Sequence, residues 1–466
     1  MFKKLYNFYS NSPLLTTWMS YLTKLLAPFF LIPLLLIRYS PQDISVYYIY
    51  VSIWSLVLVF DSGFGSTFVR LISYEWDERK SNSLNSGENS KMKTIIYVME
   101  KFYLKIWLIC LLILSLIFTI FMFKIINQST GPNLGWGCWF FFVLSYPFLI
   151  YNNVYSNYLQ GIQKIPILKK WETFFLVISL ILGSVLVFFK FSVHVLVINL
   201  QIFLILNSFC NKFLYNKFKP NAYFKKNIIL INQIKKEAIG NAFKSGIGLI
   251  MIQGLLQIIT FIYTNKYNST FLAPYFFSIA ILNNIKSFSQ VPFYSRIPEF
   301  CSLMNKNKIY KLKVKSSNSM KLVYIVFIFS FLLIGLYINR ILNLVGSNIK
   351  FIEINLWIIL GAGALIERFG AMHLQIYSTT NHILWHKMNG ISGIILILLF
   401  VILLPRFNIY AYGISHLLAY LFYYSWGSAK LSYSVLKTNF WDFEKQNFIA
   451  AIIIFLLSVV LIKYNS

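Results

Sequence analysis

Thirteen long apolar runs constrain the fold of this chain more than any other feature of its sequence. Each run is close to the roughly 20 residues that an α-helix needs to cross the hydrocarbon core of a bilayer. Only 12% of the 466 residues are charged, whereas soluble domains carry about 25%. The chain is therefore predicted to be an all-α polytopic membrane protein, with spans near residues 14–37, 44–69, 99–126, 136–160, 171–190, 193–214, 239–265, 271–291, 321–345, 352–377, 383–404, 408–429 and 447–463.

Lysine and arginine residues gather in every second loop between these runs. They are dense around 79–93, 164–170, 212–236 and 296–321, whereas the other loops hold single cations such as Arg38. Basic loops remain cytoplasmic, so the N-terminus is predicted to be cytoplasmic. The same loops account for most of the net charge of +28, and a nucleic-acid partner is not needed to explain it.

A basic linker divides the spans into two sets. The predicted organisation is a six-helix N-terminal lobe at 1–215, a cytoplasmic linker at 216–238, a six-helix C-terminal lobe at 239–432 and an extra transmembrane helix at 433–466. Both sets begin with a lysine-bearing run in the same orientation. This is the pattern of a parallel repeat, which places a central cavity and the substrate site between the lobes; coincidence among lysine-rich helices is the alternative.

Ionisable side chains inside the apolar runs are the best candidates for function. They are Lys24, Lys244, Lys286 and the adjacent Glu367 and Arg368. A charge at such a position costs about 2.5–3.5 kcal/mol on insertion scales and usually faces a cavity or a partner. Most of these cations have no acid nearby in the sequence, which favours an anionic substrate as the partner. The alternatives are lysines that reach the membrane surface and pairing with another helix.

Two acids, Asp61 and Glu367, are the candidates for carrying a coupling ion. Asp61 precedes Gly63 and Gly65, so it either caps a break in its helix or binds a proton or sodium ion. Glu367 either binds such an ion or pairs with a cation of another helix.

The remaining chemistry of the sequence predicts neither an enzyme nor a cofactor. The four cysteines are scattered, without metal or redox spacing. His382 and His386 have the i,i+4 spacing of a zinc pair, but a third ligand is missing from the sequence nearby. His373 and His416 are either satisfied core residues or proton carriers. The predicted outer loops are too short and too poor in acids for a membrane-embedded glycan polymerase or glycosyltransferase, and a glycine-rich nucleotide loop is absent.

Three features stand at the opening of the chain: Lys24, Pro28 and Pro33 in the first run, the loop SPQDIS (40–45) and the segment DSGFGSTFVR (61–70). In these features the chain resembles bacterial polysaccharide transporters of the O-antigen flippase (Wzx-type) group in the MOP superfamily. This resemblance implies a twelve-helix core in the bacterial cytoplasmic membrane. The thirteenth run departs from that core.

The resemblance also implies a function in lipopolysaccharide or capsule biosynthesis. The cargo would be an undecaprenyl-diphosphate-linked oligosaccharide, moved to the outer leaflet by alternating access, with Lys24, Lys244, Lys286 and Arg368 holding its diphosphate. Membrane lipids and other polysaccharide assembly proteins are the expected partners. The alternative function is that of a MATE-type ion-coupled small-molecule antiporter, which is expected to display more acids within its helices.

The charge asymmetry of the loops predicts which positions are reached from outside the cell. Cysteines introduced at positions 84 and 223 should resist a membrane-impermeant thiol reagent added to intact cells, whereas a cysteine at position 268 should react with it. Labelling of position 84 in sealed cells would reverse the predicted orientation.

Overall fold

The computed structural model describes residues 12–39, 43, 46–47, 49–50, 53, 63–76, 89–127, 131–219, 227–266, 269–344 and 351–465. Asp61, one of the two predicted ion-coupling acids, lies outside the described residues, as do positions 84, 223 and 268. Within the described ranges the regular structure is helical throughout.

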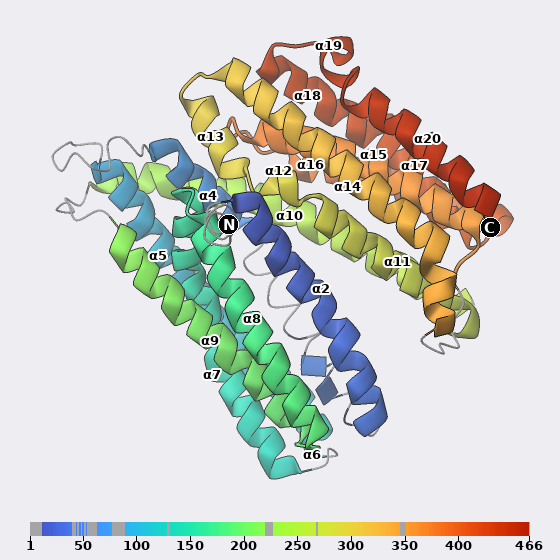
Figure 1. Ribbon diagram of the computed structural model, residues 1–466. Coiled ribbons are helices and arrows are strands. Elements are labelled where there is room, and N and C mark those ends of the chain that lie inside the picture. Colours follow the sequence, from blue (N-terminus) through green and yellow to red (C-terminus); the bar gives the residue numbers. More distant parts are fainter. Residues whose placement is uncertain are drawn as a thin grey trace, which may run out of the picture. The chain divides into compact units, whose positions relative to one another are not determined.

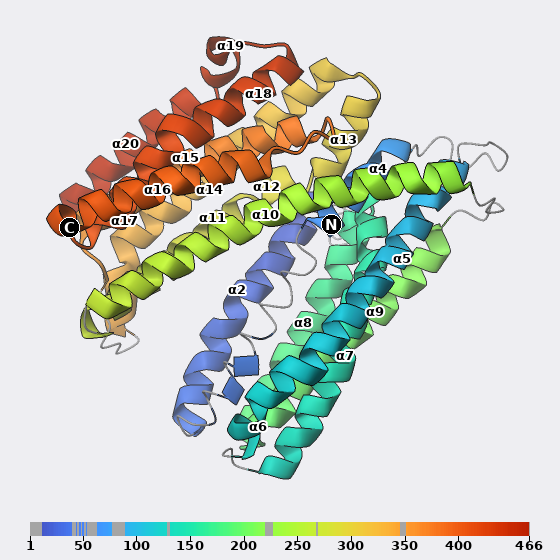
Figure 2. The ribbon, with the colours of Figure 1, turned by 180° about the vertical axis from the view of Figure 1, so that it is seen from behind.

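The chain forms two compact units, and their boundary in the sequence lies between Ala242 and Phe243. The helices of the first unit are α2 (Pro13–Arg38), α4 (Phe64–Glu75), α5 (Asn89–Ile113), a π-helical turn η2 (Leu114–Phe118), α6 (Thr119–Asn127), α7 (Pro132–Gly161), α8 (Ile165–Phe188) and α9 (Val193–Phe218). Helix α10 (Ile228–Lys266) runs through the boundary without a break, as Figure 2 shows.

The second unit continues from α10 to the C-terminus. Its helices are α11 (Ser269–Ser289), α12 (Val291–Tyr294), α13 (Ile297–Asn305), α14 (Ile309–Leu344), α15 (Ile354–Ser378), α16 (Trp385–Phe407), α17 (Tyr410–Ala419), a second π-helical turn η3 (Tyr420–Ser425), α18 (Trp426–Leu436), α19 (Phe440–Glu444) and α20 (Phe448–Asn465).

These helices follow the apolar runs of the sequence. Every predicted span overlaps a described helix. Within 44–69 the described helical residues are 46–47, 49–50, 53 and those from Phe64 onward, where α4 begins. Among the described residues, seven helices are both long and apolar enough to cross a bilayer. Many of their large apolar side chains point outward, including Ile117, Phe140 and Phe213, which is stable in lipid but not in water. The chain is a multi-pass membrane protein.

The predicted linker at 216–238 is largely helical where the structure describes it. Helix α9 reaches Phe218 and ends two residues before Pro220 in the sequence, since a residue that precedes proline disfavours helix geometry. Helix α10 begins at Ile228, because Asn227 caps it: the amide of Leu230 donates to Asn227 Oδ1 at 3.2 Å. The basic residues 235 and 236 therefore lie on a helix rather than on a loop.

Helix α7 lies at the centre of the first unit. It packs against α4, α5, α8 and α9, and α2 packs along α8 (Figure 1). Aromatic rings fill the space between these helices, with Trp139 and Phe142 stacked 5.7 Å apart and Tyr146 stacked on Phe142 at 5.4 Å.

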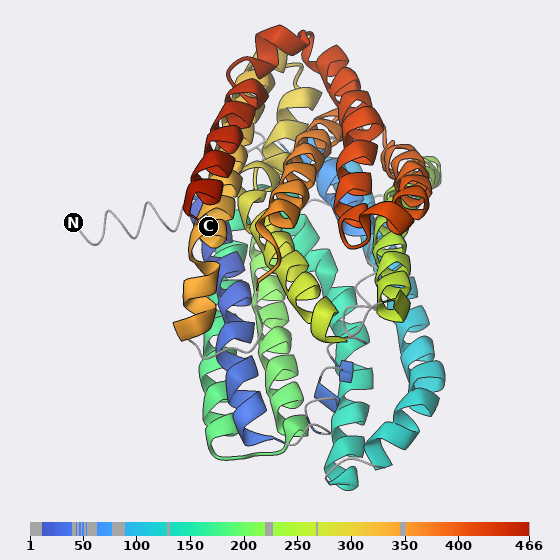
Figure 3. The same ribbon diagram turned by 90° about the vertical axis from the view of Figure 1, so that its right-hand side faces the viewer.

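Helix α15 lies at the centre of the second unit. It packs against α14, α17, η3 and α18. The C-terminal helix α20 lies along α14, as Figure 3 shows, and Phe331 of α14 stacks on Trp357 of α15 with ring centroids 5.0 Å apart.

A buried carboxylate fastens α20 to this unit. Glu444 and His373 are both 0% exposed, and His373 Nε2 lies 3.0 Å from Glu444 Oε1. The hydroxyl of Tyr433 donates to the same oxygen at 3.0 Å, and the amide of Phe448, at the start of α20, donates to Oε2 at 3.3 Å. One carboxylate thus joins α15, α18 and α20.

Removing this carboxylate should loosen the C-terminal helix. Glu444→Ala leaves buried donors without an acceptor, at about 1–3 kcal/mol for each, so the midpoint of thermal unfolding in detergent should fall by several degrees. Glu444→Gln keeps a carbonyl acceptor and should lower this midpoint by less. Asp442→Ala, an exposed change in the same short helix, is the control. Equal midpoints for Glu444→Ala and Asp442→Ala would show that Glu444 does not fasten α20.

Candidate functional site

A polar stripe runs along the face of α7 in the first unit. It consists of Asn152, Asn153, Ser156, Asn157 and Gln160. Their spacing of three and four residues places them on one side of a helix. Because exposed amides are unfavourable in hydrocarbon, a stripe of this kind in a membrane helix must face a partner or a cavity.

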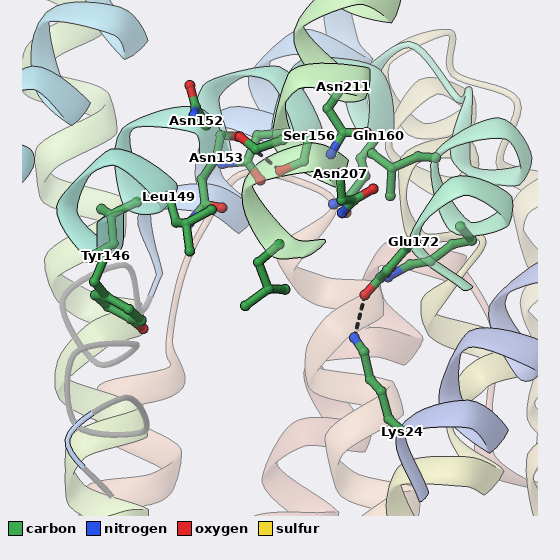
Figure 4. Close-up of a pocket in the computed structure, with 16 residues that line it drawn as sticks. Lys24, Tyr146, Leu149, Asn152, Asn153, Ser156, Gln160, Glu172, Asn207 and Asn211 are labelled. Carbon is green, nitrogen blue, oxygen red and sulfur yellow. Dashed lines mark hydrogen bonds and ion pairs between the residues drawn. The ribbon is translucent and has the colours of Figure 1, made fainter. Parts of the chain in front are cut away.

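The stripe lines a cleft with a volume of about 410 Å³, within the size range of small-molecule sites. A second polar stripe comes from α9 with Asn207, Ser208 and Asn211. Helix α8 adds Lys169 and Glu172, and α2 adds Lys24. Figure 4 shows the amides of α7 and α9 gathered at the top of the view and Lys24 below them, joined to Glu172.

Lys24 is paired within the protein, which the sequence did not lead us to expect. Its amino group donates to Glu172 Oε1, and Lys169 donates to Glu172 Oε2 at 2.6 Å. Lys24 remains 46% exposed and Glu172 only 16%. The acid was missed because it lies 148 residues away in the sequence. Two lysines share one carboxylate, so this group keeps one unit of positive charge.

A second cluster surrounds Glu367 of α15 in the second unit. Lys286 of α11 donates to Glu367 Oε2 at 2.8 Å, and Arg368 donates to Glu367 Oε1 at 2.8 Å and to Gln290 at 2.8 Å. His416 Nε2 of α17 lies 3.4 Å from Glu367 Oε2. Glu367 is 13% exposed and Lys286 20% exposed.

Close helix packing brings His416 to Glu367. A Cβ on Gly363 would lie 2.7 Å from His416 Nδ1, and a Cβ on Gly370 would lie 2.6 Å from the ring of Tyr424. These two glycines lie four residues before and three residues after Glu367, on the same face of α15. The hydroxyl of Ser425, in the π-helical turn η3, donates to the Ile366 carbonyl at 2.9 Å. Such turns are frequent at functional sites.

The structure brings together some of the predicted site residues and separates others. Lys286, Glu367 and Arg368 form one cluster, with Lys286 paired to an acid that lies 81 residues away. Lys24 belongs to the first-unit cleft. Lys244 of α10 is exposed, and the described contacts of the Glu367 cluster do not include it.

The two sites differ in chemistry. The first-unit cleft offers many amide donors and acceptors beside one ion-pair group. The Glu367 cluster offers two cations and a histidine on one carboxylate, an arrangement in which two of the groups compete for one carboxylate oxygen. Among the described residues, groups of three or more potential metal ligands are absent.

The fold resembles that of MATE transporters. A multidrug resistance MATE family transporter of the MOP superfamily, in an outward-facing conformation, is 12% identical with a TM-score of 0.65, over 92% of this chain and 96% of that chain. The MATE transporter ClbM in complex with Rb⁺ is 11% identical with a TM-score of 0.65, over 95% and 97%. The Vibrio cholerae MATE transporter VcmN in its bent form is 11% identical with a TM-score of 0.63.

These comparisons confirm the predicted fold class, an all-α twelve-helix core with an extra C-terminal helix. They give no specific support to the O-antigen flippase group. No family model matches the chain, and no curated protein matches it.

Two substitutions in the Glu367 cluster are expected to lower the stability of the protein by unequal amounts. Glu367→Gln leaves Lys286 and Arg368 mostly buried without their carboxylate and should lower the free energy of unfolding by about 3–5 kcal/mol. Lys286→Met should cost less, because Arg368 still neutralises Glu367.

The double variant measures the coupling between Lys286 and Glu367. The double variant should lose less free energy of unfolding than the sum of the losses in the two single variants, by about 0.5–3 kcal/mol. Denaturant titration in detergent measures these losses. Glu353→Gln, an exposed change just before α15, should stay within about 0.5 kcal/mol of the parent. Additive losses would contradict the pairing of Lys286 with Glu367.

Proposed function

We propose that this protein is a MATE-type ion-coupled antiporter for small molecules, in which the Glu367 cluster couples transport to a proton gradient. The observation that carries the proposal is the mostly buried carboxylate of Glu367, which is held by two cations and a histidine on a membrane helix of a MATE-like fold. The similar structures are described as transporters, one of them as a multidrug resistance protein and another as a complex with Rb⁺. We place the protein in the bacterial cytoplasmic membrane, with a cytoplasmic N-terminus.

The geometry of Glu367 supports a proton as the coupling ion. Lys286 and His416 approach the same oxygen, Oε2, whereas Arg368 holds Oε1. A proton on His416 turns its contact with Oε2 into a charge-assisted one, which competes with Lys286. Lys286 is then released to hold an anionic group of the cargo. A metal cation would be repelled by the two cations already present.

Proton and cargo are linked in this scheme through one oxygen atom. Whatever binds Lys286 changes the affinity of His416 for its proton, and the converse holds by thermodynamic linkage. The scheme requires that Lys286 be free to hold the cargo in only one protonation state of His416. Glu367 is thus the ion-coupling acid, while Asp61 keeps its predicted role as a further candidate.

A second candidate function is a flippase for undecaprenyl-diphosphate-linked oligosaccharide. The observation that favours it is the excess positive charge of both sites, each of which has two cations against one carboxylate. Arg368 adds a buried Nε without a hydrogen-bond partner among the described residues. Two such sites would attract a diphosphate and repel an organic cation, with Lys24, Lys286 and Arg368 as the substrate-binding residues and Lys244 as a further one.

The proton-coupling role of His416 is tested in proteoliposomes that contain the purified protein. An imposed proton gradient should drive the parent to move a fluorescent small molecule or to flip a lipid-linked oligosaccharide diphosphate. His416→Gln should lose the acceleration by the gradient, by about tenfold or more, because the proton no longer competes for Glu367. His382→Gln, a change at an exposed histidine of the same unit, should behave as the parent does.

The two cargoes separate the two candidate functions. Gradient-driven movement of an organic molecule alone supports the antiporter, and gradient-driven movement of the lipid-linked diphosphate alone supports the flippase. Unchanged gradient dependence in His416→Gln would remove the proposed coupling. Failure of the parent to move either cargo would contradict the proposed function itself.

A further inference from the structure

We propose that the amide-lined cleft of the first unit binds an uncharged, hydroxyl-rich group, such as a sugar or polyol portion of the cargo. Asn207, Ser208 and Asn211 of α9 are its principal recognition residues. The inference rests on the proposed function only in taking this group to be part of the cargo, since binding to the cleft requires neither a gradient nor the Glu367 cluster.

The first observation is a set of buried polar atoms that lack partners. Asn207 Oδ1, Ser208 Oγ and Asn211 Oδ1 have no hydrogen-bond partner among the described residues. Ser208 is only 6% exposed and Asn211 only 7%. Buried polar atoms are nearly always hydrogen-bonded, and leaving one unpaired costs about 1–3 kcal/mol. Three such atoms along one face of a helix, all lining the same cleft, point to a ligand that satisfies them.

The second observation is the opposing stripe on α7. Asn152, Ser156 and Gln160 line the same cleft, and α7 packs directly along α9. The polar groups of the two stripes therefore converge on one space, and Figure 4 shows the labelled side chains close together there. The cleft volume of about 410 Å³ is in the range of sites for small ligands.

The chemistry of these groups selects hydroxyls. Whichever way an amide is turned, it presents one carbonyl acceptor and one NH₂ donor. A hydroxyl both donates and accepts, so it complements an amide at either end. A phosphate only accepts and would meet the carbonyl oxygens unfavourably, and a quaternary or organic cation offers nothing for the NH₂ groups.

The charges of the cleft point the same way. Lys24 and Lys169 share Glu172, so the cations are already partnered and the group keeps only one positive charge. That surplus disfavours a cationic ligand and tolerates a neutral one. We therefore assign the amides, rather than Lys24, the main part in recognition at this site.

Binding is measured with the full-length protein in nanodiscs, by saturation-transfer NMR and calorimetry, with maltotriose and chitotriose as neutral probes. The parent should bind at least one of them. Asn207→Leu and Asn211→Leu should each weaken binding about three- to tenfold, the effect of one lost neutral hydrogen bond, and the double variant by tenfold or more. His382→Gln, an exposed change outside the cleft, should bind as the parent does.

Stability separates a binding role from a structural one. Because the oxygens of Asn207 and Asn211 are unpaired, their replacement by leucine should leave the unfolding midpoint equal or higher. The matched control is Gln201→Leu on the same helix: its side chain accepts from Ser145 at 3.0 Å and is buried outside the cleft. Gln201→Leu should lower the midpoint and leave binding unchanged.

Three results would overturn the proposal. The first is undiminished oligosaccharide binding by the Asn207→Leu/Asn211→Leu double variant. The second is a parent that binds inorganic diphosphate or tetraphenylphosphonium at this cleft but neither oligosaccharide. The third is a parent that binds none of these probes, which would make the cleft a water-filled polar cavity. None of these results depends on gradient-driven transport, so the proposed function is tested apart from them.

Discussion

A charge or an amide inside a membrane helix needs a polar partner from the protein, from water or from a ligand, because hydrocarbon supplies none. Lys24 and Lys169 share Glu172, and Lys286 and Arg368 share Glu367. Glu444 accepts from Tyr433 and from the Phe448 amide, and it lies 3.0 Å from His373. Each acid joins helices that are distant in the sequence. The arrangement of helices in each unit depends on these pairings, and so do the sites at which a cargo or a proton could enter.

The two units meet this requirement in different ways. In the second unit both carboxylate oxygens of Glu367 have partners, and two groups approach one of these oxygens. In the first unit several amides remain unpaired around a cleft. A carboxylate whose oxygens already have partners can exchange one partner for another, whereas a cleft with unpaired amides can gain a partner. The first property suits coupling, and the second suits recognition.

The sequence alone predicted the helices well, because the length of an apolar run depends on neighbouring residues and on the thickness of a bilayer. It could not reveal the partners of Lys24 and Lys286, which lie 148 and 81 residues away. The absence of an acid nearby in the sequence therefore did not mean that these lysines lack one in the fold. The amide stripe of α7 was readable from its i,i+4 spacing. Amides carry no net charge, so they stand out less in a hydropathy pattern than lysine or glutamate, although in a membrane helix they equally require a polar partner.

The π-helical turn η3 has a consequence for the register of the last core helix. An α-helix advances about 100° per residue, so the added residue of a π turn rotates everything beyond it relative to what precedes it. His416 lies before the turn and faces Glu367, while Ser425 lies at its end and faces the Ile366 carbonyl. A regular helix could not present both residues to α15 in the same way. A relaxation of η3 to regular geometry would turn α18 about its axis, so this single turn is a place where rotation of one helix segment is already built into the backbone.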